Sequence, residues 1–146
     1  MKLWLMVAVR IAVGLLFIIS GISKLMNVGL FSVVLKEFDL LPDSAVTLAA
    51  IIIPSVELVA GLMLVIGLEV KIASGIILAL MIVFIAAIIP QLIVNNNIDC
   101  GCFGLIVQEK IGLGLLFRDL ILLGLSFLCF ANADQHFRFI PTRMWR

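Results

Sequence analysis

Residues 45–94 read AVTLAAIIIPSVELVAGLMLVIGL EVK IASGIILALMIVFIAAIIPQLIV, in which three residues separate two long apolar windows. An α-helix of about 20 apolar residues crosses the ~30 Å hydrocarbon core of a bilayer. Because lipid offers no partners to backbone N–H and C=O groups, such a window must be helical there. The link at 69–71 is so short that Ala45–Leu68 and Ile72–Val94 are predicted to form an antiparallel helical hairpin.

Two further apolar windows flank this hairpin, Leu3–Ile22 and Ile111–Ala131. The sequence therefore predicts an all-α membrane protein, a four-helix transmembrane bundle that forms one transmembrane domain and ends in a short tail at 132–146. The first window exceeds the ~7–15 apolar residues of a signal peptide, which favours an uncleaved helix. Residues 32–38 are expected to form a short helix at the membrane surface.

The composition supports a membrane environment. Of the 146 residues, 64% are apolar and only 13% are charged, which is more apolar than a soluble domain of this size can cover. Membrane lipid is therefore expected to surround the helices. The net charge of +1 and the lack of a basic tract exclude nucleic acid as a partner. Three cysteines are too few for a secreted scaffold held together by disulfides.

The distribution of Lys and Arg outside the windows predicts the orientation. Five lie on the side of the two termini and the 69–71 link: Lys2, Lys71, Arg138, Arg143 and Arg146. Three lie on the opposite side: Lys24, Lys36 and Lys110. Positive residues accumulate on the cytoplasmic side of membrane proteins. Both termini are therefore expected in the cytoplasm, and the 95–110 link is expected outside.

Four ionisable residues lie within the windows: Arg10, Glu57, Arg118 and Asp119. Each costs ~2.5–3.5 kcal/mol to insert, so each is expected to have a partner or a function. From the helix rise, Arg10 lies ~10 Å and Glu57 ~15 Å from the cytoplasmic side, while Arg118 starts ~10 Å below the outer surface. Glu57 is therefore predicted to pair with Arg10 or Arg118.

Two interpretations of these charges stay open. They form a structural network that fixes the helix register, or they line a polar pocket for a proton path or a quinone headgroup, in which Arg10, Glu57 and Arg118 would be the binding residues.

Helical spacing predicts which residues share a face. In the first window a stripe contains two glycines that would let a neighbouring backbone approach closely. Its members are Arg10, Gly14, Phe17, Gly21 and Lys24. The second window presents Pro54, Glu57 and Gly61. In the last window Arg118, Leu122, Ser126 and Cys129 are expected to share a face, with Asp119 pointing ~100° away.

Residues 99–104, DCGCFG, place two thiols one residue apart in the polar break between the third and fourth windows. The favoured interpretation is a redox pair of Cys100 and Cys102, because the small disulfide ring is expected to be strained and therefore labile. A metal site is the second interpretation, although two thiolates supply only half of a tetrahedral zinc site and His136 lies on the other side. A structural turn is the third. No metal ligand is assigned, and Cys129 is expected to act as a small apolar side chain.

With these motifs the chain resembles the DoxX/MauE-like family of small four-helix membrane proteins, and specifically its MauE-type branch. The resemblance spans roughly Val9 to Ser126. The residues that carry it are Arg10-x3-Gly14-x2-Phe17-x3-Gly21-x2-Lys24, Pro54-x2-Glu57-x3-Gly61, Phe84, Asp99-Cys100-Gly101-Cys102-Phe103-Gly104 and Arg118-Asp119.

The resemblance implies a redox role in a bacterial inner membrane. MauE-type proteins accompany a thioredoxin-like partner in maturing a disulfide-rich periplasmic dehydrogenase subunit, and DoxX-type relatives are described as quinone-linked. By resemblance, Cys100 and Cys102 would be the catalytic pair of a membrane thiol–disulfide oxidoreductase, with an extracytoplasmic thioredoxin-like partner and a quinone as the implied cofactor. The alternative is a non-catalytic membrane subunit that anchors or assembles a redox complex. A small-solute permease is disfavoured, because four short helices enclose little volume.

Overall fold

The computed structural model describes residues 3–37, 41–94 and 113–133, and the secondary structure of these residues is helical. The helices are α1 (Leu3–Met26), α2 (Val28–Glu37), α3 (Asp43–Ile66), α4 (Val70–Val94) and α5 (Leu113–Ala131). The predicted all-α class is confirmed for this part of the chain.

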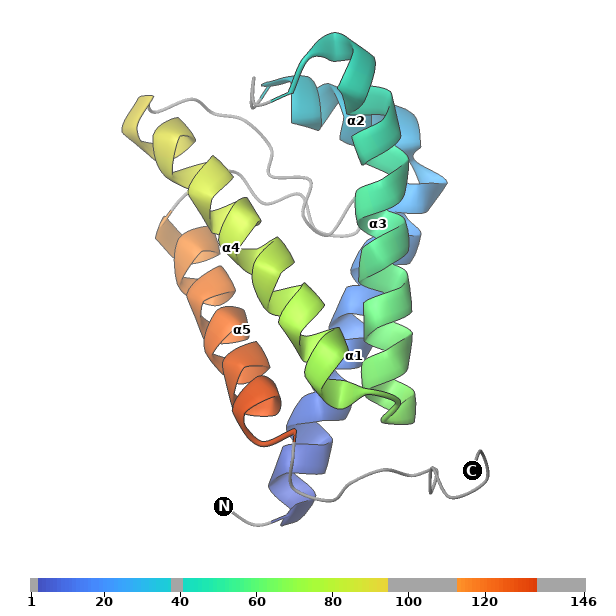
Figure 1. Ribbon diagram of the computed structural model, residues 1–146. Helices are drawn as coiled ribbons and strands as arrows, with labels where there is room; N and C mark the ends of the chain where they lie inside the picture. The colour runs from blue at the N-terminus through green and yellow to red at the C-terminus, as the bar shows by residue number, and fades with distance from the viewer. Residues whose placement is uncertain (1–2, 38–40, 95–112, 134–146) are drawn as a thin grey trace.

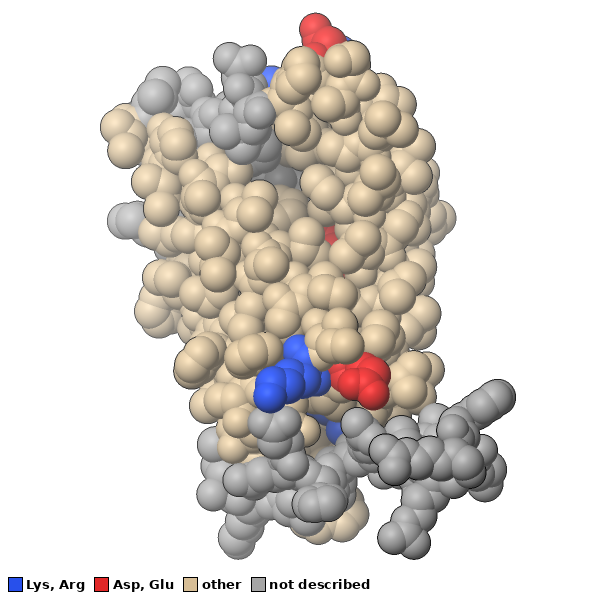
Figure 2. Space-filling view, in the orientation of Figure 1, with Lys and Arg blue, Asp and Glu red and all other residues tan. Residues whose placement is uncertain are grey.

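Three described helices are long and apolar enough to cross a membrane, at Trp4–Met26, Asp43–Ile66 and Val70–Pro90. They correspond to the first three predicted windows. The fourth window is helical over the 19 residues of α5 but is not among these candidate spans, so a fourth crossing stays a prediction. In Figure 2 the middle of the visible surface is almost free of charged side chains, as expected for a surface that faces lipid.

The helix ends differ from the predicted ones by a few residues, for identifiable reasons. α1 continues past Ile22 to Met26, because Lys24 in its last turn is buried inside the protein rather than released to solvent. α3 ends at Ile66, where Gly67 adopts a left-handed φ of 80° and its N–H bonds the Met63 carbonyl at 2.9 Å. A three-residue link then leads into α4, so the predicted tight hairpin is confirmed.

The helices form two pairs (Figure 1). α1 packs most extensively against α3, and α4 against α5, while smaller contacts of α3 with α4 and of α1 with α5 join the pairs. The start of α1, the α3–α4 link and the end of α5 lie at one end of the molecule. α2 lies at the other end, where α4 and α3 diverge.

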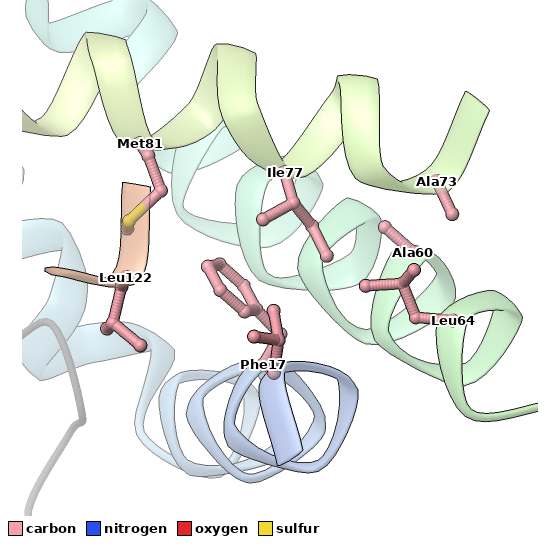
Figure 3. Close-up of a cluster of buried hydrophobic side chains, with 8 residues drawn as sticks. Phe17, Ala60, Leu64, Ala73, Ile77, Met81 and Leu122 are labelled. Atoms are coloured by element: carbon pink, nitrogen blue, oxygen red, sulfur yellow. The ribbon is translucent and has the colours of Figure 1, made fainter. Parts of the chain in front are cut away.

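A cluster of buried apolar side chains holds the two pairs together (Figure 3). Phe17 of α1 points toward the side chains of the other helices, with Ile77 and Met81 of α4 and Leu122 of α5 around it. Lipid is as apolar as these side chains, so the gain on association comes from van der Waals packing rather than from the exclusion of water. Close fit therefore matters more than apolar area.

Glycines bring the α1 and α3 backbones into contact. A Cβ atom added at Gly21 would lie 2.8 Å from the Pro54 carbonyl oxygen and 3.0 Å from the Leu58 nitrogen. One added at Gly61 would lie 2.8 Å from the Gly14 carbonyl oxygen. The predicted close approach at Gly14 and Gly21 is therefore confirmed, and its partner is α3.

Gly21→Ala is expected to destabilise the protein by about 1–3 kcal/mol, because the added methyl meets backbone atoms that cannot rotate away. Gly124→Ala on α5 is the matched control, since a Cβ there meets nothing within 4 Å. The control should leave stability unchanged or raise it by up to about 1 kcal/mol through helix propensity. Unfolding in detergent, followed by circular dichroism, measures both; equal effects of the two variants would contradict the packing.

Candidate functional site

A buried ion pair joins α1 to α3. The Lys24 ammonium donates hydrogen bonds to Oε1 and Oε2 of Glu57 at 2.8 and 2.9 Å, and both side chains are only 2% exposed. The Ser20 hydroxyl, one turn before Lys24, donates to Glu57 Oε2 at 3.3 Å. Both charged residues lie inside candidate membrane spans. The pair therefore lies where an unmatched charge would be costly.

Two aromatic rings complete the surroundings of the Lys24 ammonium. Its Nζ lies 4.7 Å from the centroid of the Phe84 ring on α4 and 5.2 Å from that of the Phe31 ring on α2. A cation held over aromatic faces is stabilised most strongly when it is desolvated. Phe31 is the buried residue of α2, so Lys24 also gives this short helix a point of attachment to the bundle.

The predicted partner of Glu57 is wrong. Glu57 pairs with Lys24 rather than with Arg10 or Arg118. The Arg10 guanidinium lies about 3.2 Å from the Cβ position of Gly67, which is ten residues, or roughly 15 Å, along the chain from Glu57. The prediction failed because Lys24 was assigned to a loop outside the membrane.

Arg10 has a different environment, at the opposite end of α3. Its side chain is 5% exposed and lies against the residue that terminates this helix. The last carbonyl groups of a helix carry partial negative charge, so a guanidinium placed there is favourable. Arg10 therefore lies at the α3–α4 end, and it does not line the cavity that contains Glu57.

The predicted face of α5 is shifted by one residue. Asp119, only 2% exposed, is buried together with Leu122, Ser126 and Cys129, which follow it at steps of three, four and three. Arg118 lies beside this face and reaches back, with its Nη2 3.1 Å from Asp119 Oδ1. The expectation that Asp119 points away from the face of Leu122, Ser126 and Cys129 is wrong. Cys129 is a buried free cysteine, in agreement with its expected place on that face.

A small cavity lies where the two helix pairs meet. Its polar lining comes from three helices: Ser20 and Lys24 of α1, Glu57 of α3 and Asp119 of α5. Its volume is ≈ 20 Å³, which is room for about one water molecule. Figure 2 shows a small spot of acidic side chain in the middle of the visible face, where the surface around it is uncharged. Of the three residues expected to form a polar pocket, only Glu57 lines this cavity.

Lys24 and Asp119 are the site residues that the sequence reasoning missed. Both were quoted in the motifs that carry the family resemblance, and Lys24 shares a face with Arg10, Gly14 and Gly21. Because Gly14 and Gly21 predict that this face of the first helix packs against another helix, the sequence could have indicated that Lys24 is buried there. Cys100 and Cys102 lie outside the described residues.

The fold and the site define a multi-pass helical membrane protein with a buried, charge-balanced cluster. The family model described as "Methylamine utilisation protein MauE" matches residues 2–132. The "Methylamine utilization protein MauE" of Paracoccus denitrificans is 36% identical over 127 residues, which cover 86% of this chain and 67% of the relative. No solved structure matches the chain. The chain belongs to the MauE family.

Glu57→Gln is expected to destabilise the protein by about 3–5 kcal/mol, because it leaves the Lys24 ammonium buried without its counter-charge. Lys36→Gln is the matched control, since it breaks an exposed ion pair with Asp43 and should cost less than about 1 kcal/mol. The double variant Lys24→Met with Glu57→Leu should recover most of the loss. Detergent unfolding measures all three, and a Glu57→Gln effect as small as that of Lys36→Gln would contradict the pair's importance.

Proposed function

We propose that this protein is a redox-associated membrane protein of methylamine utilisation that carries out thiol–disulfide exchange through Cys100 and Cys102. Its partner would be an extracytoplasmic thioredoxin-like protein. The observation that carries the proposal is the DCGCFG sequence between α4 and α5. The neighbouring ends of these helices lie opposite the α3–α4 link (Figure 1).

The chemistry follows from the spacing of the two cysteines. A thiolate of the partner attacks one sulfur of the Cys100–Cys102 disulfide and forms a mixed disulfide. The partner's second thiolate then resolves it, so that two electrons and two protons have moved to Cys100 and Cys102. The reverse sequence oxidises the partner. A disulfide across a single intervening glycine closes a small ring, which favours a labile bond over a permanent structural one.

The buried cluster would support this chemistry indirectly. The Lys24–Glu57 pair and its two aromatic neighbours connect α1, α2, α3 and α4, and therefore hold α4 in the bundle that presents the 95–112 segment. A quinone stays the cofactor that the family resemblance implies. No step of the exchange is assigned to a quinone.

The proposal requires the α4–α5 segment to lie outside the cytoplasm. Lys24 is buried in α1 and therefore no longer counts toward the outer side. That side then has two positive residues, Lys36 and Lys110, against five on the other side. A ratio of five to two favours a cytoplasmic location of the termini more strongly than five to three does. Four membrane-crossing helices would then place both termini in the cytoplasm.

Single reporter cysteines test this orientation in a variant in which all three native cysteines are replaced by serine. Lys36→Cys should react with a membrane-impermeant maleimide in intact cells, whereas Glu69→Cys in the α3–α4 link should react only after lysis. Both residues are exposed, so accessibility does not limit the reaction. The opposite labelling pattern would reverse the orientation and remove the proposed site from the outer side.

Cys102→Ser and Cys100→Ser should each trap a mixed disulfide with one thioredoxin-like protein. The remaining thiolate attacks the partner's disulfide, and the second thiol of this chain that would release the partner is missing. Mass spectrometry of the trapped adduct identifies the partner. Cys129→Ser is the matched control and should trap nothing, because it keeps both Cys100 and Cys102 and replaces only a buried cysteine.

Growth on methylamine separates exchange from the alternative role as an anchor or assembly subunit. In cells whose growth on methylamine requires this protein, the double variant Cys100→Ser with Cys102→Ser should fail to grow while Cys129→Ser grows normally. Normal growth of the double variant together with the lack of any trapped partner would favour the non-catalytic role.

A further inference from the structure

The Lys24 ammonium has more donors than the described residues accept. A lysine carries three N–H donors, and two of them are directed at Glu57, at 2.8 and 2.9 Å. Within the described part of the chain, no further oxygen or nitrogen accepts a hydrogen bond from Lys24 Nζ. An unused donor on an ammonium that is 2% exposed costs free energy, so a third acceptor is expected.

The cavity beside Lys24 can supply that acceptor. Its ≈ 20 Å³ exceeds the volume that one water molecule needs, and water in a protein interior requires two to four polar partners. Lys24, Glu57, Ser20 and Asp119 line the cavity and provide them. An apolar cavity of this size would stay dry, but this one has charged groups from three helices around it.

Asp119 provides a second carboxylate on the α5 side of the cavity. It is 2% exposed and held by Arg118, whose side chain is 28% exposed and lies in the second turn of α5. The charged residues of the cluster are thus Lys24, Glu57, Arg118 and Asp119, two positive and two negative. The side chains that α2 and α4 place against it are uncharged: Phe31, Met81 and Phe84.

We propose that the cavity holds one water molecule that accepts a hydrogen bond from Lys24 and donates one to Asp119, and that this chain relays a proton between the carboxylates of Asp119 and Glu57. The relay is a further activity of the protein, independent of Cys100 and Cys102. Asp119 is the carboxylate of the relay that contacts Arg118, and the Arg118 side chain is partly exposed on α5.

The relay moves one proton and regenerates its intermediates. Lys24 first gives a proton to Glu57 along the 2.8 Å hydrogen bond, which leaves a neutral amine with a free lone pair. The amine then turns its lone pair to the water and takes a proton from it, and the water takes one from protonated Asp119. At the end of the three transfers Lys24 is again an ammonium and the water is again neutral. The net change is a carboxylic acid at Glu57 and a carboxylate at Asp119.

Infrared difference spectroscopy after a pH jump tests the relay in protein reconstituted into lipid vesicles. The carbonyl band that is lost in Glu57→Gln reports the protonation of Glu57, and the band lost in Asp119→Asn reports that of Asp119. The decisive variant is Lys24→Arg, which keeps the positive charge but cannot release a proton. Glu57 protonation should slow by roughly 10²-fold or more in Lys24→Arg, while Asp119 protonation keeps its rate.

Asp119→Asn is a second test that does not depend on arginine fitting at position 24. Asparagine is nearly isosteric with aspartate, and the variant removes the first carboxylate of the relay. Glu57 protonation should slow in it as well, whereas the exposed control Lys36→Arg should match the wild-type protein. Protonation of Glu57 at the wild-type rate in Lys24→Arg or Asp119→Asn would overturn the relay.

The bridging water has its own test in water labelled with a heavy oxygen isotope. The wild-type protein should show an internal-water O–H band that shifts with the label and is changed in Asp119→Asn but not in Lys36→Arg. A spectrum without such a band would overturn the proposal, even if the variants proved unstable.

Discussion

The ion pair between Lys24 and Glu57 is the interaction on which the rest of the structure depends. Two opposite charges inside an apolar bundle are tolerable only when they are held together, so the pair fixes which turn of α1 faces which turn of α3. Gly21, one turn before Lys24, meets the Pro54 backbone one turn before Glu57. Charge matching and close backbone contact therefore specify the same register, and Phe31 and Phe84 bring α2 and α4 to the same place.

Features that follow from local rules were predictable from the sequence. A long apolar window in lipid must be helical, and a three-residue link between two such windows allows only a hairpin. The end of α3 and the start of α4 were therefore predicted to within about two residues. The close contact of α1 with another helix followed from Gly14 and Gly21 on one face.

Pairings that depend on which helices become neighbours were not predictable in the same way. The estimated depth of each residue in the membrane allowed Arg10 or Arg118 to reach Glu57, but depth does not tell which helices pack together. Lys24 was not considered as a partner because the first helix was predicted to end at Ile22. The buried face of α5 was displaced by a single residue, because Arg118 and Asp119 are adjacent and spacing alone does not tell which of them faces the bundle. The cysteine pair lies outside the described residues, so its role rests on the sequence motif and on family membership.

The most direct test of the account measures the distance between Lys24 Nζ and the Glu57 carboxyl carbon by solid-state NMR of isotope-labelled protein in lipid bilayers. The account predicts a strong nitrogen–carbon dipolar coupling, as expected for an Nζ within 2.8 and 2.9 Å of the two carboxyl oxygens. It also predicts the chemical shifts of an ammonium and a carboxylate. A coupling too weak for direct contact would contradict the account, because the charge that fixes α1 against α3 would then have another partner.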